Sequence, residues 1–357
     1  MTAAARPVPS APDTRPNSQA RRVHLVGSLP RPVSPDVGAG MRWVLDHARG
    51  AELRALPCDR DPFWITRYVH SRAQNAAFEV VRTGDCTGYT DIPAYRVRSG
   101  RRLTIADVAL GRPAEAAAAV EIWRELRAGF PELPPVQVSV PSPLDLALFT
   151  LGNPVRALRY YGIFEQMVIT EVTAIAAQHG PDEVAFQLES PAVLYLLRHA
   201  SATVANVIAR QLARVVASVP ESTRWTLHLC YGDLAHKSLF TPTDLEPVVL
   251  VVNALARRLA QHGRSMPAVH VPMAHGDQPP FQDPGAYAPL RRLVRRVGVI
   301  AGCVDERSPE LTEKALRYSE RALGHRVIGV AAACGYGRRA PADAEANLEL
   351  ACRLASS

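Results

Sequence analysis

Seven short apolar runs rich in β-branched residues recur along this chain, separated by longer amphipathic segments. The runs occupy residues 22–28, 136–143, 183–190, 225–232, 267–276, 297–305 and 327–335. The segments with the clearest helical pattern are 113–130, 154–180, 201–219, 244–263 and 308–323. Strands that alternate with helices in this way are typical of parallel βα units. With an eighth strand in the poorly patterned stretch 80–100, these units predict an α/β fold closed as a (β/α)8 TIM barrel.

The length of 357 residues and the apolar content of 47% suit one large barrel with a sizeable core. We expect residues 21–357 to form this single domain, and residues 1–20, rich in Pro, Ala and Ser, to form a disordered arm. No run reaches the roughly 18 apolar residues of a membrane span, and the N-terminus lacks the apolar stretch of a secretory signal. The sequence therefore predicts a cytoplasmic protein without a membrane partner.

The net charge of +7 comes almost wholly from arginine, whose densest cluster is "RRLVRR" at 291–296. Aromatic residues are not interleaved with this cluster, as they are in proteins that bind single-stranded nucleic acid. A helix face exposed to solvent accounts better for the pattern. We therefore expect no nucleic-acid partner.

Polar and sulfur-bearing residues stand at the C-terminal ends of most of the predicted strands. In a barrel of this type the chemistry takes place at that end, where the βα loops begin. The residues are Gly27, Ser28, Glu189, Ser190, His228, Cys230, His270, Asp305 and Cys334. Their repeated placement at one end of the barrel predicts a single shared pocket.

His228 and Cys230 stand one residue apart in a predicted strand, so their side chains share a face. With Cys334 they would supply one imidazole and two thiolates, which are donor types that zinc prefers. The six cysteines show no short-spaced framework, which in a reducing compartment favours free thiols or metal ligands over disulfides. The spacing alone also fits a hydrogen-bonded core histidine and two cysteines that pack as small apolar residues.

Five motifs follow one another in a set order along the chain. They are "HLVGSLPRP" (24–32), "FQLESPA" (186–192), "HLCYGD" (228–233), "VDERSPE" (304–310) and "ACGYGRR" (333–339). This ordered set resembles the zinc-bearing C-terminal barrel of the cobalamin-independent methionine synthase family, and still more closely its single-barrel relatives. The resemblance spans most of residues 22–352 and implies the same barrel fold.

The resemblance also implies a zinc site. In the family the ligands are a His-x-Cys pair, a glutamate on the following strand and a cysteine in a Cys-Gly turn. The pair falls on His228 and Cys230, and the last cysteine falls on Cys334. The glutamate has no counterpart, so the candidates for the fourth position are His270, His275, an acidic side chain from another strand, water or substrate sulfur. Three protein ligands and an open position would resemble the epoxyalkane:coenzyme M transferase barrel.

The same resemblance implies where a small amino-acid-like thiol binds. Its carboxylate would meet the backbone of the turn formed by Val26, Gly27 and Ser28. Glu189, which follows Gln187 in "FQLES", stands where a family aspartate binds the substrate amine. Asp233 lies just past the zinc-binding strand and would orient the substrate. Two plainer interpretations stay open: Glu189 could be a structural carboxylate paired with an arginine, and many Gly-Ser turns exist for steric reasons.

One departure from the family bears directly on catalysis. The family motif Asp-x-His-Ser-Pro reads "DERSP" at 305–309, so Arg307 replaces a histidine that serves in proton transfer. An arginine keeps its proton near neutral pH, but it can hold a carboxylate, sulfonate or phosphate. The candidate catalytic residues are therefore Glu189, Asp305 and Arg307.

Three hypotheses for the function follow. The first is a zinc-dependent transferase that activates a small thiol as thiolate for methyl or alkyl transfer, with the thiol and the alkyl donor as its small-molecule partners. The second is metal-free decarboxylation of the uroporphyrinogen decarboxylase type, in which arginines hold acidic substrates. The third is a non-catalytic zinc-binding barrel.

Overall fold

The computed structural model describes residues 20–59, 61–130 and 132–357. The predicted disordered arm at 1–20 lies outside the described residues except for Ala20. None of the described helices is long and apolar enough to span a bilayer.

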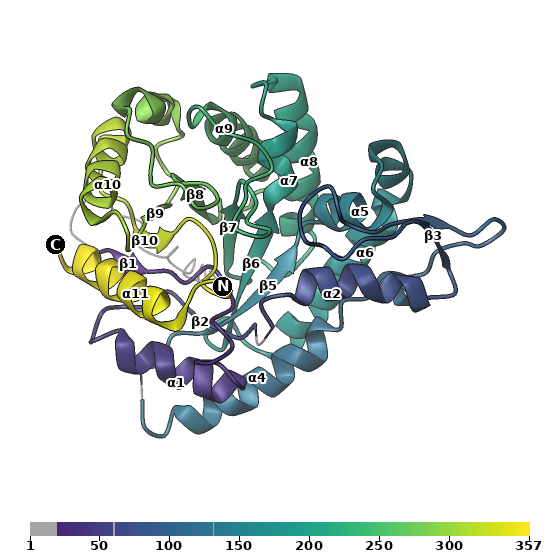
Figure 1. The fold of residues 1–357 in the computed structure, drawn as a ribbon, viewed down its shortest axis with the longest axis horizontal. Helices are drawn as coiled ribbons and strands as arrows, with labels where there is room; N and C mark the ends of the chain where they lie inside the picture. The colour runs from purple at the N-terminus through teal and green to yellow at the C-terminus, as the bar shows by residue number, and fades with distance from the viewer. Residues whose placement is uncertain (1–19, 60, 131) are drawn as a thin grey trace, which may run out of the picture.

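Eight parallel strands form the centre of the molecule, and the helices lie around them (Figure 1). In the order in which they pair, the strands are β1 (Arg22–Val23), β10 (Gly329–Ala332), β9 (Val299–Val304), β8 (Ala268–Pro272), β7 (Trp225–Leu229), β6 (Val184–Ser190), β5 (Val136–Pro141) and β2 (Leu56–Pro57). The two outer strands meet, because Val23 pairs with Leu53, just before β2, in a parallel bridge. The backbone N–H of Val23 donates to Glu52 at 2.8 Å, and that of Arg54 donates to Val23 at 2.9 Å. The predicted (β/α)8 barrel is confirmed.

The prediction of the eighth strand within 80–100 is wrong. The eighth strand is β2, which pairs with β5 through only two residues, Leu56 and Pro57. A strand this short that contains a proline leaves no alternating pattern to detect. The stretch 80–100 instead belongs to an antiparallel hairpin of β3 (Phe78–Arg82) and β4 (Ala94–Val97) that projects beside the barrel (Figure 1). Its apolar residues Val80 and Val81 are 45% and 47% exposed.

The five predicted helices are present, with boundaries within a few residues of those expected. They are α4 (Arg112–Leu126), α6 (Pro154–Gln178), α8 (Ala202–Ala217), α9 (Glu246–Gln261) and α10 (Pro309–Leu323). The side chains of Asn153 and Ser201 cap α6 and α8 by accepting a backbone N–H of the first turn. The other helices are α1 (Val37–His47), α2 (Trp64–Ser71), α3 (Ile105–Val108), α5 (Pro143–Leu151), α7 (Pro191–Leu196), α11 (Pro341–Ser356) and the 3-10 helices η1 (Arg72–Gln74) and η2 (Pro284–Arg292).

The arginine cluster at 291–296 is exposed as predicted, but it is not a helix face. The 3-10 helix η2 ends at Arg292, and the remaining residues form a turn.

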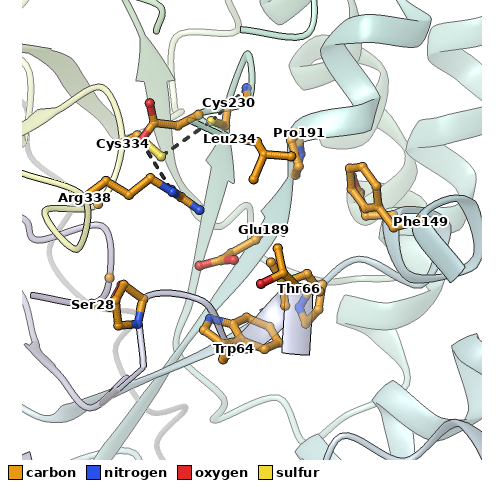
Figure 2. Close-up of a pocket in the computed structure, with 18 of the residues that line it drawn as sticks. Ser28, Trp64, Thr66, Phe149, Glu189, Pro191, Cys230, Leu234, Cys334 and Arg338 are labelled. Atoms are coloured by element: carbon orange, nitrogen blue, oxygen red, sulfur yellow. Dashed lines mark hydrogen bonds and ion pairs between the residues drawn. The ribbon is translucent and has the colours of Figure 1, made fainter. Parts of the chain in front are cut away.

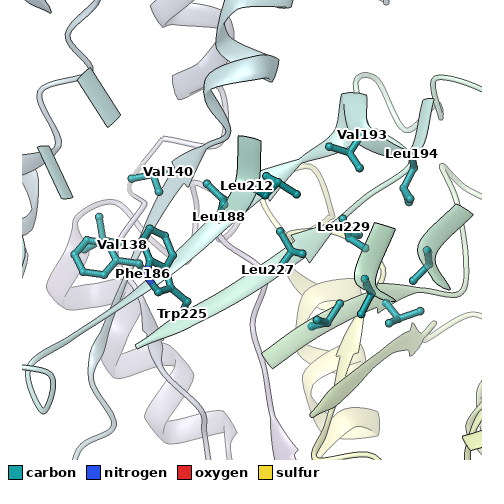
Figure 3. Packing of buried hydrophobic residues seen from close by; sticks show 14 of the residues in the cluster. Val138, Val140, Phe186, Leu188, Val193, Leu194, Leu212, Trp225, Leu227 and Leu229 are labelled. Atoms are coloured by element: carbon teal, nitrogen blue, oxygen red, sulfur yellow. The ribbon is translucent and has the colours of Figure 1, made fainter. Parts of the chain in front are cut away.

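Apolar side chains on the outer faces of the strands pack against the surrounding helices and form the main core (Figure 3). On β6 and β7 the outward residues Leu188 and Leu227 are 2% and 1% exposed, and Leu212 of α8 belongs to the same cluster. Because side chains alternate along a strand, the residues between these point into the barrel. The periodic apolar pattern thus fixes which residues face inward.

The interior of the barrel is unusually polar. Bulky aliphatic residues usually fill this space. Here buried polar side chains occupy inward positions on four strands and just after β1, namely Gln137, Gln187, His228, His270 and His24. Each makes a hydrogen bond inside the barrel, as buried polar groups require. This polar layer lies directly beneath the C-terminal mouth.

Candidate metal and substrate site

Three predicted zinc ligands meet at the mouth of the barrel. His228 lies near the end of β7, Cys230 follows that strand, and Cys334 lies two residues past the end of β10. One nitrogen of His228 and the two sulfurs lie within 4.8 Å of one another, and the sulfurs are 3.9 Å apart. In the described part of the chain this is the only group of three or more such side chains that could hold a metal ion.

The electrostatics of the two cysteines fit a cation. The hydrogen-bonded sulfur of Cys230 and burial hold the pKa of Cys334 well above its usual range. A second thiolate this close is unfavourable unless a positive charge compensates it. The backbone N–H of Gly232 donates to the sulfur of Cys230 at 3.1 Å. Such a hydrogen bond stabilises negative charge on its acceptor. A buried imidazole and two thiols fit the soft donor set of zinc.

His270, a candidate fourth ligand from the sequence, lies one hydrogen bond behind His228. Its Nδ1 is 2.9 Å from Nδ1 of His228, and its Nε2 is 2.9 Å from the carbonyl oxygen of Ala332. Burial lowers the pKa of His270 to about 4, so the ring is neutral at pH 7. Both ring nitrogens are already engaged, and His270 is not part of the group of ligand atoms.

A cavity of about 160 Å³ opens beside the His-Cys-Cys group. Figure 2 shows Glu189 pointing into the space between Ser28, Trp64 and Arg338. The turn at Val26–Ser28 forms part of the lining, as the resemblance implies. The apolar part of the wall comes from helices α2 and α5 and from loops, through Trp64, Ile65, Val69, Ile92, Phe149 and Leu234.

Glu189 is a partly buried carboxyl group whose protonation equilibrium is shifted toward the protonated form. Burial, and then the nearby charge of Asp59, raise the pKa of Glu189 to about 7. The side-chain amide of Gln187 donates to its Oε1 at 3.1 Å, and the same amide also donates to the carbonyl of Val26. Gln187 therefore ties the predicted carboxylate-binding turn to the predicted amine-binding residue.

Asp59 is a site residue to which the sequence analysis assigned no role. It follows β2, the strand without a detectable pattern, and no local signal placed it at the barrel mouth. It lines the cavity with Glu189, and its Oδ1 lies 3.1 Å from a guanidinium nitrogen of buried Arg112. That guanidinium in turn lies 3.9 Å above the ring of Trp64. Asp59 and Arg112 thus form a buried ion pair beneath the wall of the cavity.

Asp145 was also missed. It lies in the first turn of α5, lines the same cavity, and accepts hydrogen bonds from Ser142 and from the backbone N–H of Ala192, the latter at 2.7 Å. Burial raises its pKa to about 7. A helix-capping pattern was the available signal, and it predicts only a helix start.

A second cavity, of about 290 Å³, borders the same two sulfurs. It shares Cys230, Cys334, Asp233 and Arg338 with the first cavity and is otherwise lined mostly by polar residues, among them His236, His275, Glu306, Arg307 and Arg339. Arg307 and Glu189, both predicted as catalytic, therefore line different cavities. Asp305 lines neither and instead accepts from the Nε of Arg307 at 3.3 Å.

The loop after β7 is held in a strained conformation between the two cavities. Ala235 and His236 have φ angles of 54° and 56°, which residues other than glycine rarely adopt. Asp233 lies 3.3 Å from the guanidinium of Arg338, and His236 Nε2 is 2.9 Å from the carbonyl oxygen of Arg338. The loop after β10 therefore fixes the loop after β7.

Comparison with known proteins supports the fold. No family model and no curated protein sequence matches the chain. Among solved structures, a B12-independent methionine synthase from Shewanella sp. W3-18-1 in complex with selenomethionine aligns with a TM-score of 0.60 at 12% identity, over 95% of this chain and 97% of that one. A methyltransferase from Methanosarcina mazei aligns with a TM-score of 0.54 at 12% identity, over 95% and 94%. The chain shares their barrel fold.

That likeness confirms the predicted fold resemblance over nearly the whole length of the chain. The likeness is one of backbone architecture, since about seven in eight aligned residues differ.

Proposed function

We propose that this protein is a zinc-dependent transferase in which the sulfur of a small, amine-bearing thiol accepts a methyl or alkyl group. The observation that carries the proposal is the meeting of His228, Cys230 and Cys334 beside a cavity that holds buried carboxyl groups. These three residues would hold the zinc ion. When bound, zinc lowers the pKa of a coordinated thiol so that it reacts as a thiolate, which is the nucleophilic form.

The first cavity supports binding of the thiol through its amine. Glu189 and Asp59 both line it, and the charge of Asp59 acts on Glu189 strongly enough to raise its pKa. An ammonium group placed between two carboxyl groups would relieve this repulsion and return Glu189 to its ionised form. The apolar wall around Trp64 and Phe149 would exclude water from the reacting sulfur.

The second cavity supports binding of the alkyl donor. Of its three arginines, Arg307 has the most exposed side chain, at 52%, against 19% for Arg338 and Arg339. All three are paired with a carboxylate of the protein, so exposure is what distinguishes Arg307. We therefore assign Arg307 to an anionic group of the donor, as its guanidinium chemistry allows.

A decarboxylase of acidic substrates is less well supported. Such a site needs cationic groups toward the substrate, whereas the described lining of the first cavity contains Arg338 against the carboxyl groups of Asp59, Asp145, Glu189 and Asp233. Arg338 is itself paired with Asp233, so the described lining leaves no free guanidinium to hold a polyacidic ligand, and its carboxyl groups outnumber its cations.

The proposal is tested first by metal content. Elemental analysis of the purified protein should find about one zinc per chain, and Cys230→Ser and Cys334→Ser should lose it. Cys352→Ser is a matched control, because Cys352 lies in α11 and packs in the core. If the wild-type protein holds no zinc and the two ligand variants behave like the control, the proposed centre does not exist.

Calorimetric titration with thiols then separates a transferase from a non-catalytic zinc-binding barrel. L-Homocysteine, L-cysteine and 3-mercaptopropionate should be compared on zinc-loaded and zinc-stripped protein. We expect the two amine-bearing thiols to bind only when zinc is present, and more tightly than 3-mercaptopropionate. Zinc binding without affinity for any of these thiols would favour the non-catalytic alternative.

A further inference from the structure

We infer that His270 is a positioning residue that fixes the tautomer of His228, so that Nε2 of His228 is the nitrogen that binds the metal ion. The inference rests on the proposed function only for the presence of a metal. It concerns a chain of hydrogen bonds that runs from the carbonyl of Ala332 through His270 to His228.

The donor and acceptor of each of these hydrogen bonds follow from the carbonyl oxygen of Ala332. A carbonyl oxygen can only accept, so the 2.9 Å contact with Ala332 places the proton of neutral His270 on Nε2. Nδ1 of His270 is then an acceptor. Its 2.9 Å contact with Nδ1 of His228 therefore requires the proton of His228 to be on Nδ1. His228 is left with a lone pair on Nε2 alone. The weaker 3.4 Å contact of His270 Nδ1 with the carbonyl of Leu229 does not alter this order.

The space around His270 is shaped for the ring. A Cβ atom at Gly302 on β9 would lie 2.5 Å from Nε2 of His270 and 2.8 Å from the carbonyl oxygen of Val271. Only glycine therefore allows the imidazole to reach Ala332. Because Ala332 ends β10, two residues before Cys334, the chain of hydrogen bonds joins the strands that carry all three metal ligands. Partners of this kind orient metal-binding histidines and set their tautomer.

The alternative is that His270 is only a polar filler of the barrel interior. Any filler would lower stability when removed, so a loss of stability does not discriminate. A positioning role predicts in addition that the metal affinity falls and that the zinc-bound nitrogen of His228 is no longer fixed.

The test compares His270→Leu and His270→Asn with His24→Asn. Leucine removes the acceptor, whereas the side-chain oxygen of asparagine can take the place of Nδ1. His24 is a matched control, because it is also buried in the barrel and bonded to a side chain, Gln187 at 2.9 Å, but makes no hydrogen bond to His228. Zinc affinity is measured by competition with a chromophoric chelator. We expect roughly ten- to hundredfold weaker binding for His270→Leu, partial rescue in His270→Asn and little change in His24→Asn.

A spectroscopic readout identifies the nitrogen. In zinc-loaded protein labelled with ¹⁵N-histidine, long-range proton–nitrogen correlation should show His228 protonated at Nδ1 and metal-bound at Nε2, with His270 protonated at Nε2 and free of metal. His228→Gln assigns the resonances. If His270→Leu does not fold, His270→Asn and the wild-type spectrum still decide the question.

Three results would overturn the inference. They are zinc bound by Nδ1 of His228, zinc bound by His270 itself, and unchanged zinc affinity in both His270 variants. Failure of the proposed function looks different, because the wild-type protein would then bind no zinc in the first place.

Discussion

At the scale of single residues, the site is defined by buried and partly buried groups whose pKa values the fold has shifted. Burial raises the pKa of Glu189 and of Asp145 to about 7 and lowers that of His270 to about 4. Burial disfavours whichever form is charged, so acids and bases shift in opposite directions. These shifts mark the cavity as a place where a ligand charge is needed.

Glu189 should make the stability of the protein depend on pH. Its pKa is raised from 4.5 to about 7, so between these values the folded protein keeps a proton that the unfolded chain has released. Stability from this group is fully present below pH 4.5 and is lost as pH rises through 7. Glu189→Gln removes the effect, and its stability relative to wild type should rise by up to about 3 kcal/mol from pH 5 to pH 8.

Urea unfolding of both proteins across this pH range measures the difference. A flat or opposite trend for Glu189→Gln would mean that Glu189 is ionised in the folded protein without a bound cation.

At the scale of elements, strand β9 illustrates how one backbone position controls a side chain on the next strand. Gly302 on β9 pairs with Pro272 on β8, and its missing side chain leaves room for the ring of His270. Parallel strands lie about 4.8 Å apart, so an inward ring on one strand can occupy the space above its neighbour only where that neighbour has no Cβ.

Gly302→Ala should therefore disturb both stability and the metal site. The new methyl group would overlap His270 and backbone, and overpacking of this kind costs about 1–3 kcal/mol. Gly162→Ala is the matched control, because a Cβ there meets nothing within 4 Å and Gly162 lies on the exposed side of α6. That control should gain up to about 1 kcal/mol from helix propensity. Thermal unfolding and zinc competition measure the two effects, and equal behaviour of both variants would contradict the account.

At the scale of the whole molecule, the barrel depends on contacts that join the two ends of the chain. The nearly buried guanidinium of Arg21 pairs with Glu320 of α10 at 2.9 Å and donates to the carbonyl oxygens of Leu354 and Ser357 at 2.9 and 3.0 Å. It thereby joins the start of β1 to α10 and to the end of α11. The neighbouring Arg22 makes a comparable pair with Glu52, but both side chains are more than half exposed.

Arg21→Ala and Arg22→Ala should differ sharply in stability. Removing Arg21 leaves Glu320 without its partner in a largely buried site, which costs about 3–5 kcal/mol. Removing Arg22 breaks an exposed pair, which contributes about 0–1 kcal/mol. Chemical denaturation of the two variants measures the difference directly. Similar losses would show that Arg21 does not hold the two ends of the barrel together.

The sequence by itself determined where most strands and helices lie and which residues gather at the C-terminal mouth of the barrel. Alternation of apolar runs with helical segments is a local property, and it located seven of the eight strands and five helices. Because parallel strands all end at the same rim, residues that follow them are brought together without any knowledge of distances. For this reason the sequence alone predicts that His228, Cys230 and Cys334 lie together.

Only the tertiary structure decided the remaining features of the site. It identified β2 as the eighth strand, placed Asp59 and Asp145 in the cavity, divided Glu189 from Arg307 between two cavities, and put His270 behind His228. Each of these depends on sheet register and packing between segments far apart in the chain. A pattern read along neighbouring residues carries no information about such distances, because they are set by how whole elements fit together.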